Sequence, residues 1–301
     1  MQFLLMAKNI VNKTPFIKKL LLRFWFVVIM KFVLSFKIVK HVIFQKFDNK
    51  IDSDRLMINV GGGHFIKRHW RTLDVPYGVR KYWKGTIHYQ HDLCSKTPWP
   101  FIDNSVYIFY SSHTLEHIHP TWLAHNLKEA YRCLKPGGGF RITVPDYDLA
   151  YDAYKKGNLT FFHKDQYNLP NINIYKDDYD GKHMLEYAFL RYFSYHMWKR
   201  LKVEEIQKLF KTLDRYNFAD ELVNNQPIDL VGTKANIGAH VNWFNPDKLV
   251  KVMEDAGFVE VAIMKRHKSR FKEISNDKVT SRTSGFDNSY PLISCYVEGY
   301  K

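Results

Sequence analysis

Short apolar runs separated by turn-forming residues dominate residues 55–150 and predict a series of buried strands. The first run, residues 56–60, ends in Gly61, Gly62 and Gly63, as a buried strand does when it enters a tight turn. Further short strands are expected along the chain at residues 71–75, 87–93, 106–110 and 140–144.

A helix is expected between the last two of these strands. Pro120 stands at its start, and residues 135–139, with the sequence Lys-Pro-Gly-Gly-Gly, end it. Its apolar positions fall on one helical face, at Leu123, Leu127, Ala130, Tyr131 and Leu134. Because strands alternate with helices, this part of the chain predicts an α/β fold with a parallel, doubly wound sheet.

The alternation breaks at residues 151–245, where a polar stretch precedes an aromatic helical region from about residue 185 to residue 222. We interpret this part as an insertion after the fifth strand. The regular pattern resumes at Asn245, a good helix N-cap, with Pro246 at the first helical position and Gly257 at the end. Apolar residues then predict strands at residues 259–263 and 292–300.

Charge separates residues 1–50 from the remainder. The chain has a formal net charge of +15, and this segment holds +9 of it, from ten Lys and Arg residues and one Asp among many Leu, Phe, Val and Ile residues. Arg23, Lys31 and Lys37 interrupt the apolar stretch. A membrane-spanning helix needs roughly 20 apolar residues with few charges, so a span is not expected. No small-residue cleavage site follows, which argues against a signal peptide.

Two interpretations of this segment stay open. It is either a basic amphipathic helix that lies on an anionic membrane surface, or an N-terminal helix packed on the domain that follows. Its many large aliphatic residues disfavour a nucleic-acid-binding arm.

The length and composition indicate one large globular domain. Of the 301 residues, 46% are hydrophobic and 25% are charged. Cys94, Cys133 and Cys295 are isolated and odd in number, which indicates neither a zinc site nor a disulfide framework. We therefore expect a cytoplasmic protein, peripheral on the inner face of a membrane if residues 1–50 bind lipid. The expected domains are this basic segment and a domain over residues 55–301.

Polar residues at the ends of the expected strands indicate a ligand site. A glycine turn between a strand and a helix lets the backbone and the helix N-terminus approach a ligand. Asp74 ends the second strand, fifteen residues after Asn59, where a carboxylate can bind ribose hydroxyls. Asp92 and Leu93 end the third strand, where an adenine amino group could be recognised. The structural alternatives are that the glycines form only a tight turn, that Asp74 is only a surface acid, and that Asp92 only caps the next turn.

The ordered motifs of the chain resemble those of class I S-adenosylmethionine-dependent methyltransferases of the type 11 group. The most specific are Ser-Ser-His-Thr-Leu-Glu-His-Ile at residues 111–118 and Leu-Lys-Pro-Gly-Gly at residues 134–138. The others lie at residues 59–63, 73–75, 91–93, 99–106 and 144–146. Within that group the chain is most similar to predicted methyltransferases of surface polysaccharide synthesis, which also carry the patterns seen at residues 243–258 and 294–301.

The resemblance implies a Rossmann-like, seven-stranded sheet whose last strand is antiparallel, with S-adenosylmethionine at the carboxyl ends of the first three strands. The cofactor-binding residues would be Asn59, Gly61, Gly62, Gly63, Asp74, Asp92, Leu93, Ser112 and His113. The implied activity is methyl transfer, and the preferred acceptor is a hydroxyl group of a sugar or of a surface-glycan precursor.

Three positions depart from the family pattern. Asn59 and Tyr107 stand where acids are usual, and Phe65 stands at the third glycine position. Asn59 can still accept a hydrogen bond from the ammonium group of the cofactor, but it does so without charge attraction. A catalytically inert, membrane-associated partner protein with the same fold therefore stays an alternative. An RNA methyltransferase is another, although nucleic acid is not the expected partner.

His113, Asp146 and His240 are the candidate catalytic residues. Histidine has an ordinary pKa of about 6.5, so a neutral imidazole can take the proton that an acceptor hydroxyl loses. Asp146 could orient the acceptor or the imidazole; alternatively, His113 only caps a helix and Asp146 only ends a strand. A cluster of His113, Glu116, His117 and His119 lacks the metalloprotease order His-Glu-x-x-His. Cap and hydrogen-bond roles are favoured, and no metal site is expected.

Overall fold

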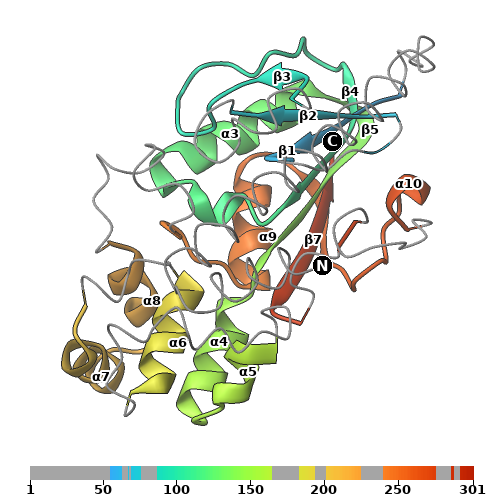
Figure 1. The fold of residues 1–301 in the computed structure, drawn as a ribbon. Coiled ribbons are helices and arrows are strands. Elements are labelled where there is room, and N and C mark those ends of the chain that lie inside the picture. Colours follow the sequence, from blue (N-terminus) through green and yellow to red (C-terminus); the bar gives the residue numbers. More distant parts are fainter. Residues whose placement is uncertain are drawn as a thin grey trace, which may run out of the picture. The chain divides into compact units, whose positions relative to one another are not determined.

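The described strands form a seven-stranded mixed sheet in the order β3-β2-β1-β4-β5-β7-β6 (Figure 1). The structure is a computed structural model, and it describes residues 55–62, 67, 69–75, 87–164, 183–193, 201–224, 240–275, 286–287 and 292–301. The basic segment 1–50, Gly63 and Phe65 lie outside these residues. The predictions about them therefore stay predictions, as does the expected domain organisation.

The sheet has the predicted Rossmann-like arrangement. Strands β1 to β5 pair in parallel, and β7 is antiparallel to both β5 and β6. The strands are β1 (Leu56–Val60), β2 (Trp70–Asp74), β3 (Tyr89–Gln90), β4 (Val106–Ser112), β5 (Leu134–Pro145), β6 (Val259–Ile263) and β7 (Ser294–Tyr300). The prediction of a seven-stranded sheet whose last strand is antiparallel is confirmed.

Both faces of the central strands are buried, as the near-continuous apolar runs predict. On one face, Ile58 and Phe109 pack against helices α3 (Pro120–Cys133) and α9 (Pro246–Asp255). On the other face, Met57 and Ile108 pack against the segment that contains helix α10 (Lys272–Ser275). Successive residues of a strand point to opposite faces, so each central strand supplies both cores.

Helices α3 and α9 begin where the sequence predicts. Pro120 and Pro246 occupy the first turns, and the side chains of the N-cap residues accept backbone hydrogen bonds. The acceptor at α9 is Asn245, and its donor is the N–H group of Lys248 at 2.8 Å. These caps satisfy N–H groups that have no partner within the helix.

Strand β5 begins six residues before the predicted strand and contains the Pro-Gly-Gly-Gly run. A side chain at Gly138 would place its Cβ 2.6 Å from the carbonyl oxygen of Tyr107, and one at Gly139 would lie 2.9 Å from that of Gly299. The glycines therefore allow the neighbouring strands to approach closely, in addition to ending α3. Conversely, β3 is shorter than predicted, because only Tyr89 and Gln90 pair with β2.

A group of helices separates β5 from α9. It contains α4 (Tyr147–Lys155), α5 (Leu159–Lys164), α6 (Met184–Phe193), α7 (Val203–Thr212) and α8 (Arg215–Asn224). These helices gather beyond the carboxyl end of β5 (Figure 1). They share an aromatic core in which the ring centroids of Tyr154 and Phe189 stack 4.5 Å apart. The aromatic residues of this region thus form a second core.

An ion cluster ties the end of the chain to the sheet. Arg141 of β5 is fully buried, and its guanidinium group donates to Asp287 at 2.6 and 3.0 Å and to Glu298 of β7 at 3.3 Å. The same group donates to the carbonyl oxygens of Lys265 and Lys268. All five guanidinium N–H groups therefore have an acceptor.

Candidate active site

The predicted site residues gather at one edge of the sheet, because the carboxyl ends of parallel strands lie side by side. Gly61 follows β1, and Asp74 ends β2. Asp92 follows β3, His113 follows β4 and Asp146 follows β5. The structure thus brings together the residues that the sequence indicated at five separate strand ends.

The glycine turn after β1 packs tightly against the segment that follows β4. Gly61 has a φ of +67°, and a Cβ there would lie 2.3 Å from the side chain of Thr114. The N–H group of Gly61 donates to the carbonyl oxygen of Leu73 at 2.8 Å. At Gly62, a Cβ would lie 2.8 Å from Thr72 and 3.1 Å from the side-chain amide of Asn59. The close neighbours at both positions, and the positive φ at Gly61, therefore require glycine.

Two carboxylates lie at the carboxyl ends of the neighbouring strands β2 and β3. Asp74 is 4% exposed, and its Oδ1 accepts a hydrogen bond from the N–H group of Val75 at 2.8 Å. Because Val60 pairs with Leu73, Asp74 lies next to the glycine turn. Asp92 accepts from the N–H group of Cys94 at 2.8 Å.

These groups fit S-adenosylmethionine: a side-chain-free turn and acids at neighbouring strand ends suit its ribose and adenine groups. Asn59 is buried at the end of β1, next to the same turn. The side chain of Leu93 belongs to the apolar core, and Ser112 ends β4. Leu93 could therefore approach a ligand mainly through its backbone, and its carbonyl oxygen accepts from Asn126 at 2.7 Å.

His113 connects two other residues of this edge. Its φ is +50°, a conformation that is uncommon outside glycine and recurs at functional sites. Its Nε2 lies 2.8 Å from the Oγ of Ser294, the first residue of β7, and its Nδ1 lies 3.3 Å from a carboxylate oxygen of Glu116. Sequence reasoning did not select Ser294, and it named Glu116 only within the cluster of histidines, although both lie in motifs that carry the family resemblance. Together the three side chains form a serine–histidine–glutamate row.

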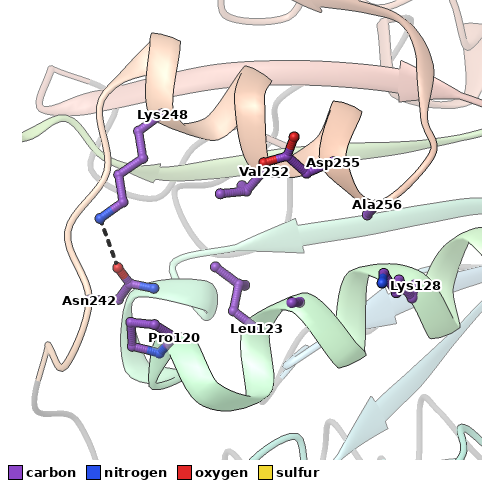
Figure 2. Close-up of a pocket in the computed structure, with 9 residues that line it drawn as sticks. Pro120, Leu123, Lys128, Asn242, Lys248, Val252, Asp255 and Ala256 are labelled. Carbon is purple, nitrogen blue, oxygen red and sulfur yellow. Dashed lines mark hydrogen bonds between the residues drawn. The ribbon is translucent and has the colours of Figure 1, made fainter.

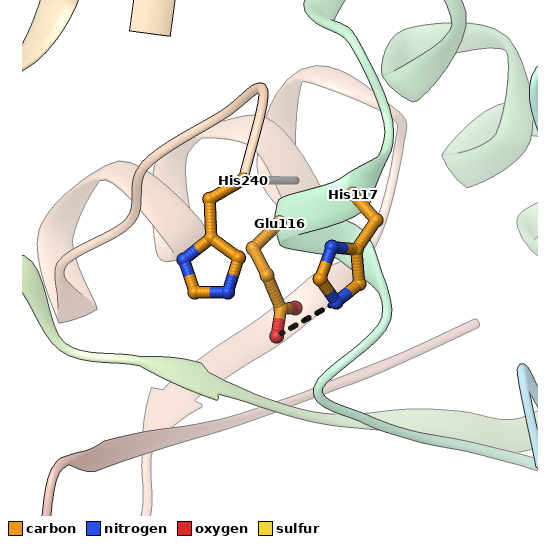
Figure 3. Close-up of side chains that lie close together, drawn as sticks. All are labelled: Glu116, His117 and His240. Atoms are coloured by element: carbon orange, nitrogen blue, oxygen red, sulfur yellow. Dashed lines mark ion pairs between the residues drawn. The ribbon is translucent and has the colours of Figure 1, made fainter. Parts of the chain in front are cut away.

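A second group of side chains surrounds the same carboxylate. Glu116 and His117 belong to the short helix η3 (Leu115–His117), and His240 comes from the segment before α9. Figure 3 shows the Glu116 side chain between the two imidazole rings. The N–H groups of Val241 and Asn242 donate to the carbonyl oxygen of Glu116 at 2.9 and 3.1 Å, which holds His240 beside it.

His119 is separate from this group. Its Nδ1 accepts from the N–H group of Thr121 at 3.2 Å and caps α3. The predicted cap role therefore applies to His119, whereas His113 precedes η3 and caps no described helix. Linking His117 to His240 required the fold, because 122 intervening residues separate them in the sequence.

Burial and neighbouring side chains together shift the pKa values of several groups at this edge. Burial tends to raise the pKa of Glu116, but the neighbouring His117, His113 and His240 hold that pKa at about 2. Burial lowers the pKa of His240 to about 3, and it raises the pKa of Asp146 to about 6. Asp146 also accepts a hydrogen bond from the N–H group of Asp148 at 3.0 Å, so it caps α4.

A separate cavity of about 320 Å³ opens between α3 and α9. Figure 2 shows Leu123 of α3 and Val252 of α9 on opposite sides of it, and Lys248 reaching toward Asn242. Lys248 donates to Asn242 at 3.2 Å, and its ammonium lies 3.7 Å from the ring centre of Trp243. Burial lowers the pKa of Lys248 to about 8. None of the predicted site residues lines this cavity.

Comparison with known proteins identifies the type of domain. Residues 74–142 match the family described as "Methyltransferase domain". This segment runs from the end of β2 into β5 and contains Asp92, His113 and Glu116. The match therefore indicates a methyltransferase domain in this part of the chain. A comparison with curated proteins gives no significant match.

Solved methyltransferase structures resemble the chain distantly. A SAM-dependent methyltransferase from Archaeoglobus fulgidus is 12% identical, with a TM-score of 0.38, over 88% of this chain and 94% of that one. Human N-acetylserotonin methyltransferase in complex with SAM is 12% identical, with a TM-score of 0.37, over 84% of this chain and 49% of its own. The chain thus spans about half the length of the human protein. These likenesses are too weak to bear on the acceptor.

Within the part of the chain that the structure describes, no helix is long and apolar enough to cross a membrane.

Proposed function

We propose that this domain transfers a methyl group from S-adenosylmethionine to a hydroxyl group of a sugar or surface-glycan precursor. The observation that carries the proposal is the Ser294–His113–Glu116 row beside the glycine turn and Asp74. A histidine that contacts a hydroxyl group on one side and a carboxylate on the other is suited to removing a proton from a hydroxyl.

The residues at the ends of β1, β2 and β3 would hold the cofactor. Asp74 would accept hydrogen bonds from ribose hydroxyls, and Asp92 would face the adenine side. The backbone of Gly61 and Gly62 would lie against the ligand, and Asn59 would accept a hydrogen bond from its ammonium group. S-adenosylmethionine, when bound, supplies a methyl group already activated on a sulfonium, so the protein contributes chiefly by positioning the acceptor.

His113 would act as the base. With its Nδ1 turned toward Glu116, the Nε2 atom faces a hydroxyl group, which is Ser294 Oγ at 2.8 Å. As the acceptor oxygen gains its bond to the methyl carbon, its proton would pass to Nε2. The buried Glu116 carboxylate would stabilise the imidazolium ion that results. Asp146 and His240, at the same edge, are further candidates for orienting the acceptor.

The hydroxyl acceptor agrees with the presence of a base, and the sugar class follows from the resemblance to methyltransferases of surface polysaccharide synthesis. The test is to incubate the full chain with methyl-labelled S-adenosylmethionine and with separate fractions of glycan precursors, RNA and protein. We expect label in the glycan fraction. Label only in RNA or protein would contradict the proposed acceptor, and binding of the cofactor without any transfer would indicate an inert protein.

A further inference from the structure

The carboxylate of Glu116 is buried and lacks hydrogen bonds of ordinary geometry. The residue is 1% exposed, and neither of its carboxylate oxygens accepts a hydrogen bond of ordinary geometry from any residue that the structure describes. The nearest ring nitrogens, at 3.3 Å in His113 and 3.7 Å in His117, are at ion-pair distance. A buried ionised carboxylate is costly unless it is paired or binds a metal ion.

Two imidazole nitrogens converge on this carboxylate. One ligand atom from each of Glu116, His117 and His240 lies within 4.8 Å of the other two. Ligand atoms that share a divalent ion at about 2.1 Å stand roughly 3.4 Å apart in a tetrahedral site. Side-chain rotations that move these atoms by about 1 Å would therefore bring them into coordination distance of one ion.

The main chain fixes this arrangement. Glu116 and His117 are neighbours in η3, and the hydrogen bonds from Val241 and Asn242 to the carbonyl oxygen of Glu116 dock the segment that carries His240. The rings of His117 and His240 meet edge to face, with their centres 5.0 Å apart (Figure 3). The ligand set is thus assembled from two segments that the fold holds together.

We propose that Glu116, His117 and His240 bind a divalent transition-metal ion such as Zn²⁺ or Fe²⁺. Imidazole nitrogens favour these ions over Mg²⁺ and Ca²⁺, which prefer sites made of oxygen ligands alone. A set of two histidines and one glutamate is one that catalytic zinc sites use, and three protein ligands leave at least one position open.

The role of the ion rests on the proposed function. Thr114, two residues before Glu116 in the chain, packs on Gly61 of the glycine turn, where the proposed function places the cofactor. Held by Glu116, His117 and His240, such an ion would have an open position for the oxygen of the acceptor hydroxyl and would make that hydroxyl more acidic. The proton would pass to His113 Nε2 as the oxygen–methyl bond forms and the sulfur–methyl bond breaks, with the bonding electrons left on sulfur.

The test is a metal titration of the full chain after chelator treatment. Co²⁺ serves as the probe, because bound Co²⁺ absorbs visible light, and Zn²⁺ competition confirms a shared site. We expect the unmodified chain to bind one equivalent of Co²⁺. The His117→Ala and His240→Ala variants should lose this binding. His125→Ala, which removes a histidine of α3 outside the cluster, should keep it. Circular dichroism reports whether each variant folds, and Glu116→Gln provides a third ligand variant that keeps the size of the side chain.

The outcomes separate the two proposals. Absence of stoichiometric binding in the folded, unmodified chain overturns the metal site, as does equal binding by folded ligand variants and the control. Cofactor binding and methyl transfer that persist after complete metal removal would leave the proposed function standing without the ion. Stoichiometric metal without cofactor binding would leave the metal site standing and refute the proposed function.

Discussion

At the scale of single residues, the positions of the site residues followed from their place after strands. Asp74, Asp92, His113 and Asp146 could be grouped from the sequence, because parallel strands bring their carboxyl ends to one edge. The side chains that His113 contacts across the fold could not be predicted in this way. The contact of His113 with Ser294 depends on the antiparallel return of β7, which places Ser294 opposite Pro145.

The His113→Ala variant tests the base. Removing the imidazole should lower the rate of methyl transfer about 100-fold or more, while cofactor affinity stays within a few-fold. Rates with labelled cofactor and saturating acceptor measure the effect, and His125→Ala is the matched control. Full turnover of His113→Ala across pH 6–9 would eliminate this role and direct attention to Asp146 and His240.

Asp146 makes a pH-dependent contribution to stability. Its pKa is raised to about 6 in the folded protein, mainly by burial, from an ordinary value of 3.8. Between these values the folded state binds more protons than the unfolded state, so this group favours folding at low pH and that contribution is lost as the pH rises through 6.

Asp146→Asn removes this dependence and keeps an oxygen for the α4 cap. The free energy of unfolding of the variant, relative to that of the unmodified chain, should therefore be about 2 kcal/mol more favourable to the folded state at pH 7.5 than at pH 4.5, at 1.36 kcal/mol per pKa unit. Urea unfolding at both pH values measures the difference. A stability difference that is the same at the two pH values would show that Asp146 titrates near its ordinary pKa.

At the scale of elements, the apolar pattern located the strands and helices that bury one or two continuous faces. It predicted β1, α3 and α9 closely, because their apolar spacing, capping residues and glycines agree. It also located β6, although most residues of that strand are exposed. It misplaced the start of β5, since Pro-Gly-Gly reads as a turn, whereas here the glycines permit close pairing with β4 and β7. The length of β3 depends on its pairing with β2, which local sequence does not specify.

The Arg141 cluster should make a large contribution to the attachment of β7. Arg141→Met leaves Asp287 and Glu298 buried without their cation, and breaking such a buried pair costs about 3–5 kcal/mol. The exposed pair of Lys251 and Asp255 is the control, because Lys251→Met should change stability by less than about 1 kcal/mol. Urea unfolding compares the two variants. Similar small effects in both would contradict a structural role for the buried cluster.

At the scale of the whole molecule, the basic segment 1–50 distinguishes the chain from a bare methyltransferase domain. Its charge of +9 among many apolar residues predicts binding to an anionic membrane surface. Flotation with anionic liposomes should recover the full chain and lose a version that begins near Asp52. Salt should release the bound protein. Equal recovery of both versions, or release by detergent alone, would contradict a surface-bound helix.

The central claim is that the edge formed by β1, β2 and β4 binds S-adenosylmethionine for methyl transfer. Calorimetric titration of the full chain with S-adenosylmethionine tests this claim most directly. We expect saturable binding by the unmodified chain and by Glu204→Ala, which removes an exposed acid from α7. Asp74→Ala should weaken binding about 10- to 150-fold, since a hydrogen bond to a charged group is worth about 1.5–3 kcal/mol. No binding by the unmodified chain, or unchanged affinity in Asp74→Ala, would contradict the account.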